Sequence, residues 1–199
     1  FVNDSSDIRT FADLKGRRVP AGWTSQRLGE YLFRGFFANV GMSYDDVEKV
    51  TLAAMPRMWE EFVQGNVDVA FGTFGGSQVQ EIKTRVNGIR YLQLNSDPEA
   101  VKVMEAILPS AYVTRKPTKS GEMVNVMEFD FVVFTGAHVA DDVVYKTVSA
   151  IHGGKADLVA TSGLWNALNP SGMAKKVKVP FHPGAEKFYR EQGILPAQH

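Results

Sequence analysis

A short polar turn near the start of the chain carries side chains suited to binding an anion. Its consecutive residues are Trp23, Thr24, Ser25, Gln26 and Arg27. The guanidinium of Arg27 can hold a carboxylate through two parallel hydrogen bonds. Thr24 and Ser25 are good N-cap residues for a following helix, whose first N–H groups also favour an anion. The turn therefore predicts a carboxylate site, although a plain strand–helix connection is the better interpretation of an arbitrary turn of this kind.

A second candidate turn, residues 72–76, is rich in glycine, which lets backbone N–H groups approach a ligand closely. We expect Thr73, Phe74 and Gly75 to form the opposite wall of the same half-site, with Tyr112 near it. The turn is not a P-loop, because the GxxxxGK[ST] pattern is missing. A flexible connection is an equal alternative for this turn taken alone. Core packing is the default for an aromatic residue on either turn, but aromatics on polar turns often line pockets.

The chain shows no arrangement of residues typical of an enzyme. Cysteine is absent, which excludes thiolate nucleophiles and thiolate metal ligands, and there is no GxSxG elbow. The histidines are scattered without metal-ligand spacing; they are His138, His152, His182 and His199. The acidic pairs at 45–46 and 141–142 each begin a predicted helix, where carboxylates interact favourably with the helix dipole. The sequence therefore predicts no catalytic residue, no metal site and no cofactor.

Strands and helices alternate from residue 17 to residue 108. The expected strands are 17–19, 47–52, 67–71 and 89–94. The expected helices run from the polar turn to residue 40, over 56–64, over 77–86 with Ser77 and Gln80 as a capping box, and over 97–108. This order predicts an α/β fold with a mostly parallel sheet and right-handed crossovers. Ligands of such sheets bind at the carboxyl ends of the strands, and both candidate turns follow strands on that edge.

The rest of the chain has a different pattern. We expect residues 112–127 to be irregular and the apolar run 129–135 to be a buried strand. Helices are expected over 139–152 and 155–167, and a last helix follows His182 and ends at Gly193. No internal repeat relates this part to the first.

Bulk composition excludes several classes of protein. The chain has 199 residues, with 22 Lys and Arg against 22 Asp and Glu, so the formal net charge is zero. A nucleic-acid binder would usually show a basic excess. No apolar run reaches the ~20 residues that a membrane-spanning helix needs. The lack of cysteine fits an exported protein. Because Phe1 and Val2 look like the end of a strand, we expect the chain to be a piece of a longer protein.

Several motifs occur together in one order and point to a family. They are Asp13-Leu14-Lys15-Gly16, Gly41 with Asp45-Asp46, Gly65-Asn66-Val67-Asp68-Val69-Ala70-Phe71, Ile107-Leu108-Pro109, Asp141-Asp142-Val143-Val144-Tyr145 and His182-Pro183-Gly184-Ala185-Glu186-Lys187-Phe188-Tyr189. Nearly end to end, they resemble the TAXI family of solute-binding receptors of TRAP transporters. The closing HPGAxxFYxxxG motif, combined with the DDxxY step, is the most specific part of the resemblance.

The resemblance implies a two-lobed periplasmic-binding-protein fold that holds its ligand between the lobes. It implies a periplasmic or otherwise extracytoplasmic receptor that delivers a small organic acid to a sodium-driven TRAP permease. Dicarboxylates, 2-oxoacids and glutamate are the ligands implied. It does not imply catalysis. The usual Gly-Ser-Gly turn is replaced here by Ser25-Gln26-Arg27, and this bulkier turn would suit a different or an aromatic acid.

By the same resemblance, residues 1–127 correspond to the second lobe and residues 128–199 to the segment that returns to complete the first lobe. The opening half of that first lobe is expected to be absent. The strand at 129–135 would then expose an edge that invites pairing with another chain. We therefore expect this chain to bind the ligand weakly or not at all, and to associate or swap segments unless the missing N-terminal piece is supplied.

Two alternatives remain open. One is an enzyme on a similar bilobal frame, which turnover of plausible acids would reveal. The other is the ligand-sensing module of a regulator, which a flanking signalling or DNA-binding domain would favour. Adjacent permease genes would favour transport.

Overall fold

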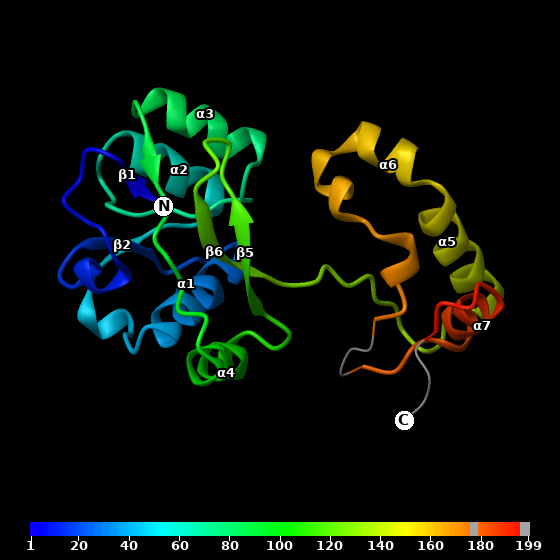
Figure 1. Ribbon diagram of the computed structural model, residues 1–199. Coiled ribbons are helices and arrows are strands. Elements are labelled where there is room, and N and C mark those ends of the chain that lie inside the picture. Colours follow the sequence, from blue (N-terminus) through cyan, green and yellow to red (C-terminus); the bar gives the residue numbers. More distant parts are fainter. Residues whose placement is uncertain (176–178, 196–199) are drawn as a thin grey trace. The chain divides into compact units, whose positions relative to one another are not determined.

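The computed structural model describes residues 1–175 and 179–195, which divide into two compact units, 1–130 and 131–199. The division falls close to the boundary expected between residues 127 and 128. Figure 1 shows the first unit as strands covered by helices and the second as helices alone. That these units correspond to lobes stays a prediction.

Two pairs of strands form the frame of the first unit. β2 (Arg18–Ala21) runs parallel to β3 (Glu48–Thr51), as expected for strands joined by a helical crossover. β1 (Val2–Asn3) runs antiparallel to β4 (Ile89–Arg90), which is shorter than the strand predicted over 89–94.

Residues 67–71 join the two pairs, although they do not form the regular strand predicted there. The Asp68 N–H donates to the Arg18 carbonyl at 2.9 Å. Phe1 and Ala70 exchange backbone hydrogen bonds of 2.7 and 3.0 Å, the pattern of an antiparallel pair. The segments therefore lie in the order β3, β2, 67–71, β1, β4, and all but β1 run in the same direction. This layer has the mostly parallel character that the alternating pattern predicts.

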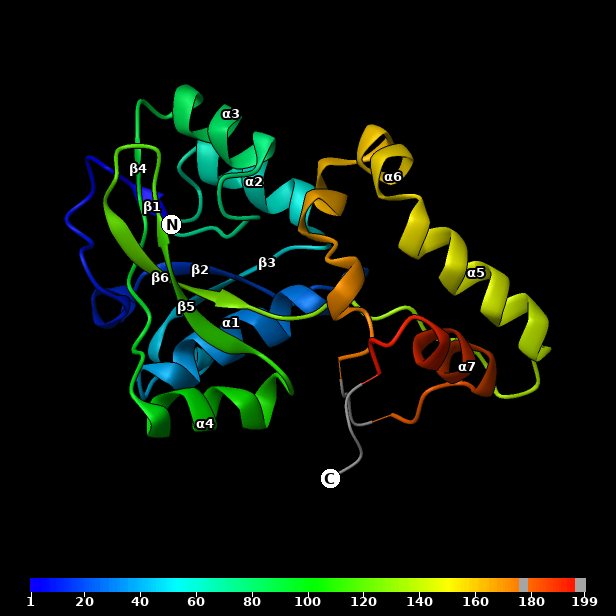
Figure 2. The same cartoon turned by 45° about the vertical axis from the view of Figure 1, so that its right-hand side comes forward.

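Helices cover both faces of this layer (Figure 2). α1 (Leu28–Asn39) packs with α4 (Pro98–Ile107), while α2 (Met55–Val63) packs with α3 (Ser77–Arg85). Two short 3-10 helices, Phe11–Leu14 and Tyr44–Asp46, complete the connections. The core is rich in aromatic side chains, because α1 places Phe33 and Phe37 in it with less than 2% of either exposed.

The prediction of an irregular segment over 112–127 is wrong, because these residues form a hairpin. β5 (Tyr112–Pro117) pairs antiparallel with β6 (Met123–Glu128). The turn closes with a 2.7 Å hydrogen bond from the Thr118 N–H to the Glu122 carbonyl, and Gly121 takes a left-handed φ of 87°. Polar residues occupy both faces of this hairpin, so the apolar alternation that marks a strand is weak.

The buried strand expected over 129–135 is also wrong. Phe131, Val133 and Phe134 are 80%, 70% and 89% exposed, and no strand of the described residues pairs with this run. An apolar run becomes a strand only where a neighbouring strand accepts its backbone hydrogen bonds.

The second unit is helical. α5 (Asp141–Gly153), α6 (Lys155–Thr161) and α7 (Pro183–Glu191) agree with the predicted helices, except that 3-10 turns at Gly163–Ala167 and Pro170–Gly172 follow α6. α5 and α7 approach closely, since a Cβ at Gly184 would lie 2.1 Å from the Asp141 carbonyl oxygen. The small core contains Val144, Phe188 and Tyr189. Among the described residues, the helices are too short or too polar to cross a membrane.

Candidate functional site

Four segments follow the parallel strands and lie at one edge of the sheet, which we call the rim. They are residues 22–27, 52–54, 72–76 and 91–96. The two predicted turns are neighbours on it, because the strand segments that lead into them are hydrogen-bonded side by side. Beneath them, the rings of Trp23 and Phe71 lie 5.8 Å apart. The structure thus brings the two turns together, and the carboxyl edge of a parallel sheet is where α/β folds bind ligands.

Trp23 supports the first turn from below. Its side chain is fully buried and stacks on Phe33 with ring centroids 6.3 Å apart. The indole N–H donates to the hydroxyl of Tyr44 at 3.4 Å, and that hydroxyl donates to the Pro20 carbonyl at 2.9 Å. Burial raises the pKa of Tyr44 well above its usual value, so the phenol stays protonated and keeps both bonds. Core packing, the default interpretation of Trp23, therefore describes its side chain.

Two glycines make room for this arrangement. Trp23 itself has a positive φ of 33°, and Gly22 before it has a φ of 83°. A Cβ at Gly29 would lie 2.5 Å from the indole, so only glycine lets the first turn of α1 sit on the ring. The position of the polar turn thus depends on the contact between Trp23 and Gly29.

The expectation that Thr24 or Ser25 caps α1 is wrong. The helix begins at Leu28 with Arg27 at the N-cap position, and no side chain accepts a hydrogen bond there. Ser25 instead donates to the Ala53 carbonyl through both its N–H at 3.1 Å and its hydroxyl at 2.9 Å. The hydroxyl bonds across the rim because the neighbouring loop offers it an acceptor.

Gln26 fastens the same two loops. Its side-chain oxygen accepts a 2.8 Å hydrogen bond from the Met55 N–H at the start of α2. This oxygen satisfies one of the free N–H groups of that helix, as an N-cap side chain would. Among the predicted site residues of the first turn, Thr24 and Arg27 are exposed and make no side-chain hydrogen bond to a described residue.

The second turn is short and closed. Its Gly76 N–H donates to the Thr73 carbonyl at 2.9 Å, and Gly75 has a φ of 72°. Gly76 is the N-cap of α3 and Ser77 is already helical, so the predicted Ser77–Gln80 capping box is wrong. Thr73 and Gly75 are exposed, while Phe74 is half-buried with its ring 5.0 Å from that of Tyr91.

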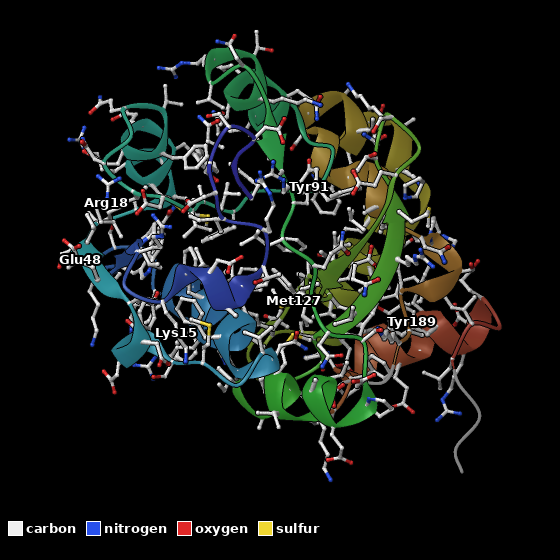
Figure 3. All side chains as sticks on the ribbon, turned by 60° about the vertical axis from the view of Figure 1, so that its left-hand side comes forward. Lys15, Arg18, Glu48, Tyr91, Met127 and Tyr189 are labelled. Carbon is white, nitrogen blue, oxygen red and sulfur yellow. The ribbon has the colours of Figure 1, made fainter. Side chains whose placement is uncertain are left out.

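Tyr91 is a rim residue that the sequence analysis missed. It lies directly after β4 (Figure 3), at the carboxyl end of a strand that was predicted over 89–94. Burial raises the pKa of its phenol, and a hydrogen bond from the Gly75 N–H lowers it by less. The hydroxyl is therefore protonated at neutral pH. The sequence carried no signal for it, because the strand predicted over 89–94 places Tyr91 in its interior, whereas β4 ends at Arg90.

Tyr112 begins β5, opposite Glu128. Its placement near Phe74 stays a prediction.

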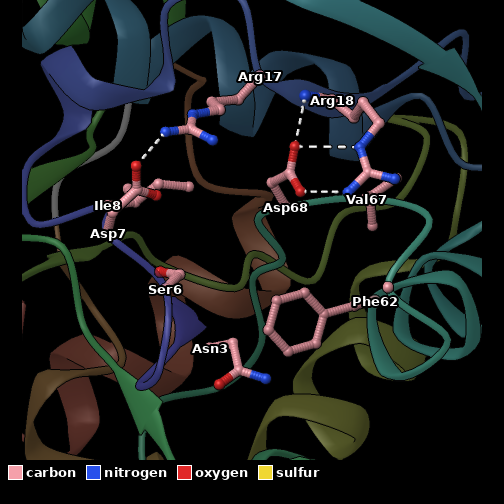
Figure 4. A pocket seen from close by; sticks show the side chains of 10 residues that line it. Asn3, Ser6, Asp7, Ile8, Arg17, Arg18, Phe62, Val67 and Asp68 are labelled. Carbon is pink, nitrogen blue, oxygen red and sulfur yellow. Dashed lines mark hydrogen bonds and ion pairs between the residues drawn. The ribbon is translucent and has the colours of Figure 1, made fainter.

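The amino edge of the sheet holds a different feature. A cavity of about 140 Å³ lies there, lined by residues that include Ser6, Arg17 and Arg18 (Figure 4). Its charges are paired within the protein. Arg18 grips Asp68 through both Nε and Nη2 at 3.2 and 2.5 Å, and Arg17 donates to Asp7 at 2.6 Å. These pairs leave little cationic charge for an anion. Among the described residues, no three acidic or histidine side chains gather to hold a metal.

A sequence model of the NMT1-like family matches residues 1–193. The chain belongs to the NMT1-like family. This is a family of periplasmic binding proteins that includes solute receptors of TRAP and ABC transporters. Membership confirms the α/β periplasmic-binding-protein-like fold class and a solute-binding role. NMT1-like proteins are generally not enzymes and typically act outside the cytoplasm.

Proposed function

We propose that the chain is the ligand-binding part of an extracytoplasmic receptor of the TAXI type, which captures a small organic acid for a TRAP transporter. The observation that carries the proposal is an exposed, unpaired guanidinium on the rim. Within the described part of the chain, Arg27 forms no ion pair, whereas Arg18 and Arg34 are held by Asp68 and Glu30. The motif resemblance to TAXI receptors supports the class of transporter.

The backbone beside Arg27 adds to this anion site. Within the described residues, the N–H groups of Gln26, Arg27 and Leu28 donate to no protein acceptor, and they lie at the start of α1. Free N–H groups and the positive end of the helix dipole favour a carboxylate. Ser25 and Gln26 hold the turn in place through the loop at 53–55, and the exposed hydroxyl of Thr24 offers one more donor.

On the other side, Thr73, Phe74 and Gly75 form the proposed second wall. Gly75 and Thr73 present exposed backbone and a hydroxyl, and the ring of Phe74 supplies apolar surface. Trp23 contributes to ligand binding by holding the polar turn in position. Tyr112 is proposed as a further contact on the strength of its place after the Ile107-Leu108-Pro109 step.

Substitution of Arg27 tests the proposal. Arg27→Ala removes charge-assisted hydrogen bonds worth roughly 1.5–3 kcal/mol, which is a loss of about 10- to 150-fold in affinity. Calorimetric titration with 2-oxoglutarate, succinate and glutamate measures this loss. Arg85→Ala is the matched control. Arg85 is an exposed arginine at the end of α3, and its ion pair with Glu81 is long, at 4.0 Å. Equal affinities of the Arg27→Ala and Arg85→Ala variants would remove Arg27 from the site.

We also propose that the apolar run at 131–134 associates with a second copy of the chain. Val133 and Phe134 are 70% and 89% exposed, and such surface favours pairing. Light scattering of the parent and of a Val133→Lys, Phe134→Lys double variant measures this association, which the two lysines should weaken. A parent chain that stays monomeric at high concentration would contradict this proposal and leave ligand binding untouched.

A further inference from the structure

The charges on the rim limit what kind of acid can bind there. Of all the residues in the four rim segments, Arg27 alone carries a formal charge, and none is acidic. Glu30, the acid nearest to Arg27 in sequence, is 2.5 Å from Arg34, and Asp97, which directly follows the last rim segment, is the N-cap of α4. The rim therefore offers one cation for one carboxylate. It offers no carboxylate to a ligand ammonium group, and no second cation to a second carboxylate.

The same rim carries an aromatic surface. Phe74 and Tyr91 lie 5.0 Å apart with their planes inclined by 52°, and Phe1 packs edge-on against Tyr91 from the far side at 6.5 Å. Phe74 and Tyr91 are half-buried, so part of each remains accessible to solvent. Aromatic rings of this kind favour stacked or edge-on contact with another ring.

The order of the strands places Phe74 on the turn next to the one that carries Arg27. The turn with Arg27 and the turn with Phe74 follow neighbouring segments of the sheet, which lie roughly 5 Å apart. A ligand that places its carboxylate on the first turn and its ring on the second would span these two neighbouring segments. The Tyr91 hydroxyl, which accepts a hydrogen bond from the Gly75 N–H of the same turn, keeps its proton and can donate it to a polar group of the ligand.

We propose that this rim selects a monocarboxylate with an aromatic body, such as an aryl 2-oxoacid, in preference to dicarboxylates and amino acids. The carboxylate binds at Arg27 and the ring lies against Phe74 and Tyr91. The inference rests on the proposed function, because it requires the rim to be the site where an organic acid binds. A charged group placed against Phe74 would lose its hydration without gaining an opposite charge, which is unfavourable.

Three ligands that differ in one group each provide the test. Phenylpyruvate carries the keto acid and the ring. Phenylalanine exchanges the keto group for an ammonium, and 2-oxoglutarate exchanges the ring for a carboxymethyl group, which adds a second carboxylate. Calorimetric titration of the chain should show phenylpyruvate binding at least tenfold more tightly than either of the others. Phe74→Leu keeps the apolar volume and removes the ring. It should weaken phenylpyruvate roughly 2- to 13-fold and leave 2-oxoglutarate unchanged.

Phe181→Leu is the matched control, since that ring lies in the other unit and is likewise half-buried against a tyrosine, 5.3 Å from the ring of Tyr189. It should change none of the affinities. If 2-oxoglutarate or phenylalanine binds as tightly as phenylpyruvate, or if Phe74→Leu leaves phenylpyruvate binding unchanged, the aromatic selectivity is wrong and the receptor function stands. If none of the three acids binds to the folded chain, the proposed function fails and the inference fails with it.

Discussion

The contact between Gly29 and Trp23 gives the most direct test of how the rim is built. A methyl group added at Gly29 would lie 2.5, 2.6 and 2.7 Å from three carbon atoms of the indole. The ring has no room to retreat, because it is fully buried and packs on Phe33 and Phe71. Overpacking costs about 1–3 kcal/mol, while Gly to Ala inside a helix gains up to about 1 kcal/mol. We expect Gly29→Ala to lower the free energy of unfolding by about 1–2 kcal/mol.

Urea unfolding followed by circular dichroism measures this change. The midpoint should fall while the slope stays the same, because a change in stability alone does not alter the surface exposed on unfolding. Gly153→Ala is the matched control. Gly153 is the last residue of α5, and a Cβ there would meet no atom within 4 Å. Its midpoint should stay the same or rise.

A second substitution isolates the contact itself. Trp23→Leu removes the ring atoms that the new methyl group would meet, so Gly29→Ala should be neutral or stabilising in that background. The resulting coupling energy between the two positions should be at least about 1 kcal/mol. Equal effects of Gly29→Ala in both backgrounds would refute the proposed contact. So would a urea midpoint of the Gly29→Ala variant that is no lower than that of the parent.

Three further predictions concern the surroundings of the rim and the sheet below it. Tyr44→Phe should cost roughly 1–2 kcal/mol in urea unfolding, because it leaves the Pro20 carbonyl without its donor; no loss would mean that water replaces the hydroxyl. Gln26→Ala should cost about 1 kcal/mol by removing the acceptor at the start of α2, and Gln26→Glu should restore most of it. Burial of Asp68 favours its neutral form, but the hydrogen bonds and charge of Arg18 outweigh burial and hold the pKa of Asp68 below its usual value. Its contribution to stability is therefore present above about pH 4 and lost as the pH falls through the lowered pKa, so the stability gap between the parent and Asp68→Asn should be about 1.5 kcal/mol at pH 7 and shrink at pH 3. A gap that does not change with pH would contradict this assignment.

Local pattern was enough to predict most of the helices and the strands β2 and β3. β2, β3 and the helices α1, α2, α4 and α5 lie within a few residues of their expected positions. Their apolar residues recur with the period of the element, and that period is a property of the chain alone. The mostly parallel order followed from the alternation of strand and helix, and the motifs led to a family of solute receptors to which the chain belongs.

Capping was the weakest local inference. Thr24, Ser25 and Ser77 have the right side chains for an N-cap, yet none of them caps the helix that follows. A hydroxyl bonds to whichever acceptor lies nearest, and for Ser25 that is a carbonyl 28 residues away in sequence. The partner of such a side chain is set by the packing of two loops.

The sequence by itself determined the class of fold, the family and the polar character of the two turns. Those features depend on residue type, order and local period. Only the tertiary structure showed that the turns are neighbours on one rim, that Trp23 lies beneath it, and that Tyr91 belongs with Phe74. It also turned residues 112–128 into a hairpin and left 131–134 exposed. These outcomes depend on contacts between segments distant in the chain, and no local pattern of residues specifies which of those segments will meet.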